Sequence, residues 1–347
     1  MSALLLSLST PADHSDSKII WPWCPYSQRP QVDQGDSLDM YMEKTQLVRK
    51  IARFYEQDSE IYPFTRNFTG WQHALFYSLT PATLRRLAPF PSRIKTLGDN
   101  AKPFAHLFVH GWAHTITPGV SSNEEQPRVS KFQLDKTVAA VAKRDLRFCV
   151  MTDKIGVVDY VCILPYAVLT LDADVLAPLL DVAAQFFETS FHKYLMQGIV
   201  ELRTRGDQPW NMLCLRSDMR ALFHRGMVGL RPEYLAKDRE EGTTTWFAAL
   251  SFQWLSRNKV VRTTRVVPGE ASIADMLAPS DDDDKVRDTP GGLLQACRRL
   301  NEDTIFIPFE NKRDAQMMMS ALALRWAAGA IWQRAGATGL APGELEC

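Results

Sequence analysis

The chain of 347 residues has no excess of charge of either sign, since 40 Lys and Arg are balanced by 40 Asp and Glu. Proteins that bind nucleic acid usually carry a basic surplus, because contacts to phosphate groups supply much of their affinity. The zero net charge therefore counts against nucleic acid as a partner. A small molecule or another protein is left as the expected kind of partner.

Long apolar runs and cysteine frameworks are also missing. No apolar run approaches the roughly 18–20 residues that a membrane-spanning helix requires, so no membrane partner is expected. The short apolar run 3–8 has no basic residue before it and lacks the form of a secretory signal. The six cysteines include no CxxC pair, which favours reduced thiols over a disulfide scaffold or a closed zinc site. We therefore expect a cytoplasmic or nuclear protein.

Common nucleotide-binding and hydrolase signatures are absent as well. We find no glycine-rich phosphate loop, no serine-nucleophile elbow and no dinucleotide-binding fingerprint. What the sequence does contain suits a folded protein, because 46% of its residues are hydrophobic and 10% aromatic. The length allows one or two domains.

Three segments have the composition of solvated chain rather than of a packed core. Residues 1–37 are rich in Ser, Pro, Asp and Gln and predict a flexible N-terminal arm. Residues 119–130 are polar and predict a loop. Residues 278–292 hold the acidic run Asp281–Asp284 followed by Pro-Gly-Gly, which predicts an acidic mobile linker.

Between the arm and the middle of the chain, residues 38–140 predict a helical N-terminal region. Apolar residues recur at helical spacing over Leu38–Gln57. Thr80 followed by Pro81 is a helix-start signal, with an N-cap residue before proline at the first helical position.

The second half mixes strands with helices and predicts an α+β fold. A core over residues 141–260 is followed, after the linker, by a C-terminal strand and helix in residues 293–347 that pack on it. The predicted strands are Phe148–Met151, Val157–Leu169, Thr244–Leu255 and Thr304–Pro308, and the predicted helices are Ala173–Glu201, interrupted at Pro178, and Arg313–Arg334, buried on more than one side.

Two stretches of this half carry small motifs whose order and spacing fit together. In residues 144–165 they are Arg144-Asp145, then Cys149 and Thr152, then Val161-Cys162-Ile163-Leu164-Pro165. In residues 211–232 they are Asn211, Leu215, Arg220, Phe223, Gly226 and Leu230-Arg231-Pro232. By these motifs, and by a terminal helix with Trp326 that ends in Ala335-Gly336-Ala337-Thr338, the chain resembles fungal HNH-nuclease-domain proteins over about residues 140–340.

The resemblance implies a ββα-metal (HNH-like) core embedded in a largely helical chain. In such a core a β-hairpin and a following helix hold one divalent metal. A strand histidine acts as general base on water, an asparagine orients it, and a helix histidine binds the metal. In this sequence Cys162, Asn211 and Arg220 hold the three positions, and His224 lies one helical turn beyond Arg220.

Two of these residues depart from what the reaction needs. Cysteine does not replace a histidine that acts as base on water. Arginine carries a fixed positive charge, so at a ligand position it repels a divalent cation. The sequence therefore predicts an HNH-nuclease-like protein that has lost nuclease activity and keeps the fold for a binding or pathway role, without a cofactor.

Two alternatives stay open. The converted pocket could serve an isomerase, cyclase or lyase of fungal specialised metabolism, with Cys162, Arg220 and His224 acting on a small molecule. In that case Arg216, Arg220 and Arg225, from an arginine-rich segment, would bind its phosphate or carboxylate.

The other alternative is an active endonuclease with a remodelled site. Asp159, Asp218 and His224 would then supply the metal ligands from shifted positions. Outside the HNH-like part, His106, His110 and His114 recur every four residues and share one helix face. They predict either a metal-binding pair or a polar stripe packed against aromatic neighbours.

Overall fold

A computed structural model describes residues 19–20, 38–56, 69–111, 131–152, 157–187, 189–240, 243–255, 304–335 and 337. The predicted arm, the polar loop at 119–130 and the acidic linker at 278–292 lie outside these residues, apart from a two-residue strand, β1 (Ile19–Ile20). The rest combines many helices with two small antiparallel sheets, as an α+β fold requires.

Between residues 38 and 144 the described part of the chain consists mainly of helices. Its helices are α1 (Leu38–Glu56), α2 (Gly70–Ser78), α3 (Pro81–Leu87), α4 (Pro91–Asp99), α5 (Ala101–His110) and α6 (Lys131–Arg144). The predicted start of α3 is confirmed, because the Thr80 hydroxyl oxygen accepts a hydrogen bond of 3.2 Å from the backbone N–H of Thr83.

The larger sheet has the strand order β1-β4-β5-β6, with every neighbouring pair antiparallel. Its main strands are β4 (Val228–Glu240), β5 (Thr243–Trp254) and β6 (Thr304–Phe309), so the two strands predicted at residues 244–255 and 304–308 are confirmed. The smaller sheet pairs β2 (Val158–Cys162) with β3 (Met212–Arg216).

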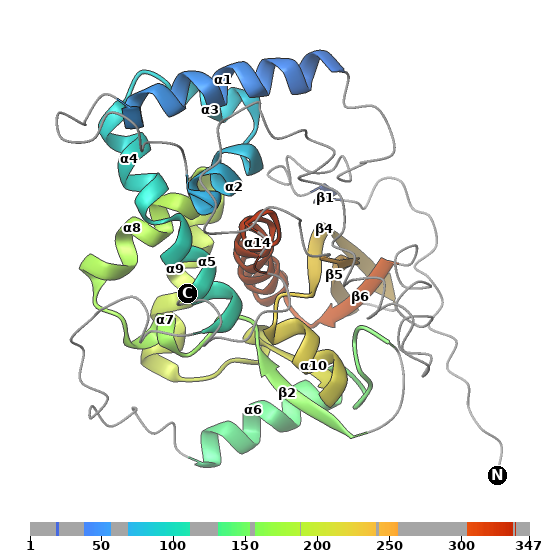
Figure 1. Cartoon of the computed structure of the whole chain (residues 1–347). Helices are drawn as coiled ribbons and strands as arrows, with labels where there is room; N and C mark the ends of the chain where they lie inside the picture. Colours follow the sequence, from blue (N-terminus) through green and yellow to red (C-terminus); the bar gives the residue numbers. More distant parts are fainter. Residues whose placement is uncertain are drawn as a thin grey trace, which may run out of the picture.

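One helix, α14 (Lys312–Arg334), runs through the middle of the molecule. Figure 1 shows it between the N-terminal helices on one side and the four-stranded sheet on the other. It packs against α2, α5, β4 and β5, and against α9 (Thr189–Arg205). Its apolar residues point in all directions and most are buried, which confirms the prediction of a helix buried on more than one side.

Three of the predicted strands and helices differ from the structure. Residues 148–151 form a turn with one isolated bridge, because Leu146 and Arg147 both adopt left-handed backbone (φ 52° and 59°) in a tight turn that begins at Asp145. The strand predicted to run to Leu169 ends at Cys162, and a short helix, α7 (Ala167–Thr170), follows Pro165.

The long helix predicted over residues 173–201 is two helices, α8 (Ala173–Ala183) and α9. The break lies after Ala183 and not at Pro178, which is inside α8. A proline in the second turn of a helix removes one backbone hydrogen bond, and α8 tolerates that loss.

Candidate functional site

The motif residues meet where the two-stranded sheet contacts a short helix. Helix α10 (Ser217–His224) follows β3 directly and packs against both β2 and β3 (Figure 1). The strands are antiparallel, with Val158 opposite Arg216 and Cys162 opposite Met212. Helices α7, α8 and α9 lie between them in the sequence, so no tight hairpin turn joins the strands.

The two faces of β2 have different neighbours. Cys162 packs against Met212, Cys214 and Val141, and Val141 belongs to α6. Alternate residues on the other face, including Val161, join the main core with Met219 and Phe223 of α10. Side chains alternate between the faces of a strand. The structure therefore directs Cys162 towards α6, away from Arg220 on α10.

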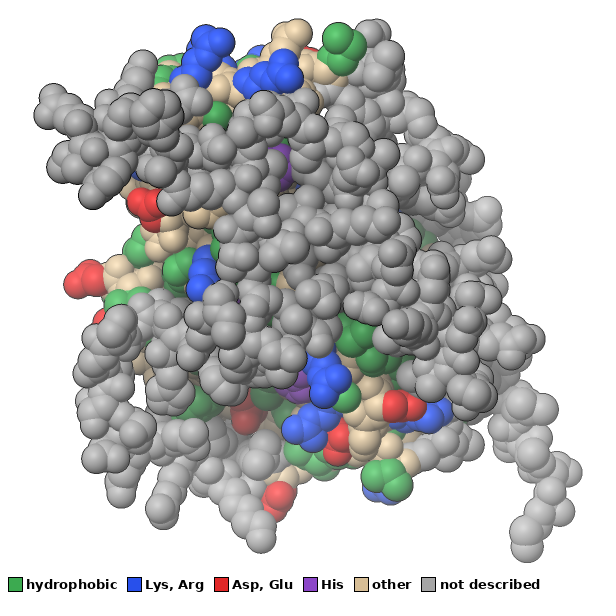
Figure 2. Space-filling model, viewed as in Figure 1, with side chains coloured by type: hydrophobic (Ala, Val, Ile, Leu, Met, Phe, Trp, Pro, Cys, Tyr) green, Lys and Arg blue, Asp and Glu red, His purple; other side chains and the backbone are tan. Residues whose placement is uncertain are grey.

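Arg220 pairs with an acidic residue of β2. Its guanidinium Nη1 lies 3.4 Å from Oδ2 of Asp159, and the two side chains are 52% and 32% exposed. Exposed ion pairs of this kind contribute about 0–1 kcal/mol. The position that the resemblance assigns to a metal ligand thus holds a cation, and the carboxylate of Asp159 is already paired with it. Figure 2 shows basic and acidic side chains interleaved with a histidine on the surface where α10 lies.

The second acidic candidate, Asp218, is also engaged. One of its oxygens accepts a hydrogen bond of 2.7 Å from Arg216, and the other accepts one of 2.8 Å from the backbone N–H of Met219. A carboxylate in the first turn of a helix interacts favourably with the helix dipole. Within the described ranges, no three His, Cys, Asp or Glu side chains form a group that could hold a metal ion. These residues as arranged do not fit a divalent metal.

His224 is partly buried at the end of α10, where its ring meets the Phe223 ring edge-on at 6.4 Å. Burial, together with the positive charges of Arg325 and Arg220, lowers its pKa to about 4. The imidazole is therefore neutral at pH 7. With so low a pKa it is a weak general base.

Cys162 has the opposite shift. Burial and the nearby charge of Asp207 raise the pKa of its thiol to about 12. The thiolate is the form that attacks electrophiles and binds metals. Cys162 is thus a protonated thiol at neutral pH, packed between β2 and α6.

Asn211, the predicted orienting residue, is buried and bonds to the backbone beyond the end of β2. Its side-chain oxygen accepts a hydrogen bond of 2.8 Å from the N–H of Leu164, and its amide nitrogen donates one of 3.3 Å to the carbonyl of the same residue. Its own carbonyl accepts from the N–H of Ile163 at 2.7 Å. Asn211 therefore continues the pairing of β2 with β3 past the last strand residue.

Arg144 and Asp145, noted in the sequence only as a motif, form a buried ion pair with two N–H to oxygen contacts of 2.6 and 2.8 Å. Arg144 also donates to the carbonyls of Pro209 and Met212, each at 2.7 Å, and Asp145 accepts from the N–H of Cys214 at 3.0 Å. The pair fixes the start of β3 against the end of α6.

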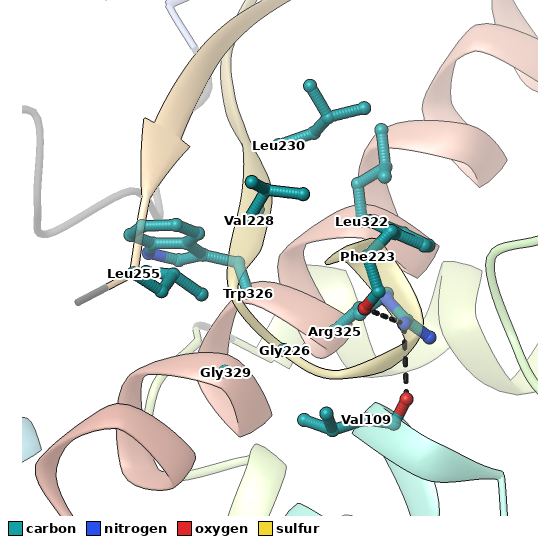
Figure 3. A pocket seen from close by; sticks show the side chains of 11 residues that line it. Val109, Phe223, Gly226, Val228, Leu230, Leu255, Leu322, Arg325, Trp326 and Gly329 are labelled. Carbon is teal, nitrogen blue, oxygen red and sulfur yellow. Dashed lines mark hydrogen bonds between the residues drawn. The ribbon is translucent and has the colours of Figure 1, made fainter. Parts of the chain in front are cut away.

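Arg325, which sequence reasoning missed, is a buried cation beside α10. It is the only charged residue between Ala315 and Trp332, and that isolation in an apolar helix was the available signal. Its guanidinium lies 3.8 Å from the centre of the Phe223 ring. Figure 3 shows it donating to the carbonyls of Phe223 and Val109 at the edge of a small cleft.

That cleft lies between α14 and the start of β4. Its lining is mostly apolar and includes Gly226, Leu322 and Trp326 (Figure 3). The enclosed volume of ≈ 10 Å³ admits about one water molecule. A small-molecule enzyme would need a larger pocket that reaches Cys162, Arg220 and His224, and none of these three lines this cleft.

The remaining candidates lie apart from one another. Arg225 is exposed at the end of α10. His106 is buried, and its ring lies 5.5 Å from the ring of Trp71 and 5.1 Å from that of Trp332. Such packing is what the polar-stripe interpretation predicts for His106. The side chain of His110 and all of His114 lie outside the described residues.

No family model, curated protein or solved structure matches the chain. In the part of the chain that the structure describes, no helix is both long enough and apolar enough to span a bilayer.

Proposed function

We propose that β2, β3 and α10 are a degenerate ββα-metal core. The protein is then HNH-nuclease-like, does not cleave nucleic acid, and keeps the fold to bind a small molecule or a protein partner. The observation that carries this proposal is the Arg220–Asp159 ion pair at the metal-ligand position.

A divalent ion at this position would have to approach the fixed positive charge of Arg220 while Asp159 is partly neutralised by that same charge. The residue at the base position, Cys162, packs on the opposite face of β2 as a protonated thiol. Metal-assisted hydrolysis needs a charged Lewis acid and a base at one phosphate. Neither the metal-ligand position nor the base position keeps the group that this reaction needs. The two positions also lie on opposite sides of β2, with Arg220 near Asp159 and Cys162 facing α6.

The direct test combines metal content with cleavage. Purified protein is analysed for bound metal and incubated with supercoiled plasmid and single-stranded DNA in Mg²⁺, Mn²⁺ or Zn²⁺. We expect no stoichiometric metal and no cleavage above a buffer control. Metal-dependent cutting that is lost in Asp159→Asn would overturn the proposal in favour of the remodelled nuclease.

A gain-of-binding experiment tests whether the residues around position 220 can hold a metal ion once the arginine is replaced. Arg220→His removes the repelling charge and places a second imidazole four residues before His224 on one helix face, with Asp159 opposite. Histidines at that spacing can share one metal ion. We expect Arg220→His to bind Zn²⁺ at least about tenfold more tightly than the unmodified protein, measured by calorimetry at pH 7.

Arg225→His is the matched control, because it makes the same substitution on an exposed residue at the end of the same helix. It should bind Zn²⁺ no better than the unmodified protein. Equal gains in both variants would mean adventitious surface binding and would remove the support that the Arg220 position gives to a ββα-metal core.

A further inference from the structure

The guanidinium of Arg325 joins three segments that are far apart in the sequence. Its side chain is buried and only 7% exposed. Nη1 donates to the carbonyls of Phe108 at 3.0 Å and Ile163 at 3.4 Å. Nη2 donates to the carbonyls of Val109 at 3.1 Å and Phe223 at 2.9 Å. These acceptors belong to the end of α5, the segment after β2 and the end of α10.

A buried cation normally needs a buried anion, because isolated charges are costly in the interior. Among the described residues no carboxylate pairs with Arg325. Phe108 and Val109 lie in the last turn of α5, and Phe223 lies in the last turn of α10. The final carbonyls of a helix lack helical partners and carry the negative end of its dipole. The two converging helix ends therefore supply the compensating charge.

We propose that Arg325 makes the end of α5, the segment after β2 and the end of α10 a single unit that opens and closes together. If α10 alone moved away, Arg325 would lose both the Phe223 carbonyl and the ring it stacks on, while its charge stayed buried. The same holds for α5, which supplies two of the four acceptors. Leaving a buried charged donor without partners is costly, which disfavours movement of one segment alone.

Coupling of this kind has a consequence for any ligand that binds on α10. A ligand that holds α10 closed also holds α5 closed, and tightening α5 favours binding at α10, because coupling between two sites is reciprocal. The unit thus connects the surface that carries Arg220 and His224 with the N-terminal helices.

Native-state hydrogen exchange of the full chain tests the proposal with Arg325→Lys. Lysine keeps the charge but has one nitrogen instead of a planar fork, so it cannot donate to four carbonyls spread over three segments. We expect amide exchange at the ends of α5 and α10 and at residues 163–164 to accelerate together, by about tenfold or more. Acceleration in only one of the three segments, or in none, would overturn the proposal.

Arg334→Lys is the matched control on the same helix. Arg334 also donates to the end of a helix, with Nη1 2.8 Å from the carbonyl of Tyr77 in α2. Its replacement should accelerate exchange at the end of α2 and leave the Arg325 unit unchanged. The slowest amides of the chain, followed in the same experiment, report global unfolding. If every amide in Arg325→Lys merely shifted to that common limit, the loss would be one of overall stability, and the coupling would be refuted.

Discussion

Replacing Asp145 with alanine is expected to lower the free energy of unfolding by about 3–5 kcal/mol, the usual cost of removing one partner of a buried ion pair. Both side chains of the Arg144–Asp145 pair are almost inaccessible to solvent. Without Asp145, Arg144 keeps its charge in a buried position, and the N–H of Cys214 loses its acceptor. Of the hydrogen bonds that the pair makes to the start of β3, only those from Arg144 to the carbonyls of Pro209 and Met212 would remain.

Urea denaturation at pH 7 measures this effect, and the chain offers a matched control. Asp181 pairs with Arg93 at 2.9 Å on the surface, where both side chains are more than one third exposed. Asp181→Ala should cost no more than about 1 kcal/mol. A second check is Arg144→Ala combined with Asp145→Ala, which should cost less than the sum of the two single changes. Equal losses for Asp145→Ala and Asp181→Ala would contradict a structural role for the buried pair.

Stability is also expected to fall as the pH drops from about 6.5 to 4, and His73 is expected to be a main cause. His73 is 2% exposed, stacks on Tyr77 at 4.3 Å, and among the described residues its Nε2 has no hydrogen-bond partner. Burial, and to a lesser degree the charge of Arg334, lower its pKa from 6.5 to about 4. Between these two values the unfolded chain binds a proton that the folded protein excludes.

Each pH unit in that window therefore favours the unfolded state by up to about 1.4 kcal/mol, for a total on the order of 3 kcal/mol. Above pH 6.5 the histidine is neutral in both states and has no effect, and below pH 4 the loss stays constant. Unfolding free energies measured by urea at pH 7, 6, 5 and 4 should fall less steeply in His73→Phe than in the unmodified protein. His224, whose pKa is also lowered to about 4, contributes in the same direction and remains in both proteins. Parallel curves for the two proteins would refute the assignment to His73.

The sequence was informative where a local pattern decides the structure. Thr80 and Pro81 start a helix by local capping, and the alternating aromatic and β-branched residues of β5 can form a strand wherever a partner exists. The apolar residues around α14 likewise predict a helix buried on more than one side. In each case the determining residues lie within one element.

The predictions failed where contacts between residues distant in the sequence determine the local structure. Leu146 and Arg147 carry no sequence signal for left-handed backbone, yet the turn they form lets the N–H of Val150 bond to the carbonyl of Cys214. The direction of the Cys162 side chain depends on which face of β2 packs against α6. The alternation of side chains along a strand does not show which face that is. The motif residues could therefore be aligned from the sequence, but not the direction in which each side chain points.

Asn211 occupies a position that resembles a catalytic one, but its contacts are structural. With its side-chain amide it reproduces the donor and acceptor of a missing strand residue and holds Leu164 as a neighbouring backbone would. Alanine there would leave a buried peptide group unpaired, whatever reaction the protein performed or had given up. An asparagine at this position is accordingly a marker of how the chain is folded. It gives no information on whether a phosphodiester is cut.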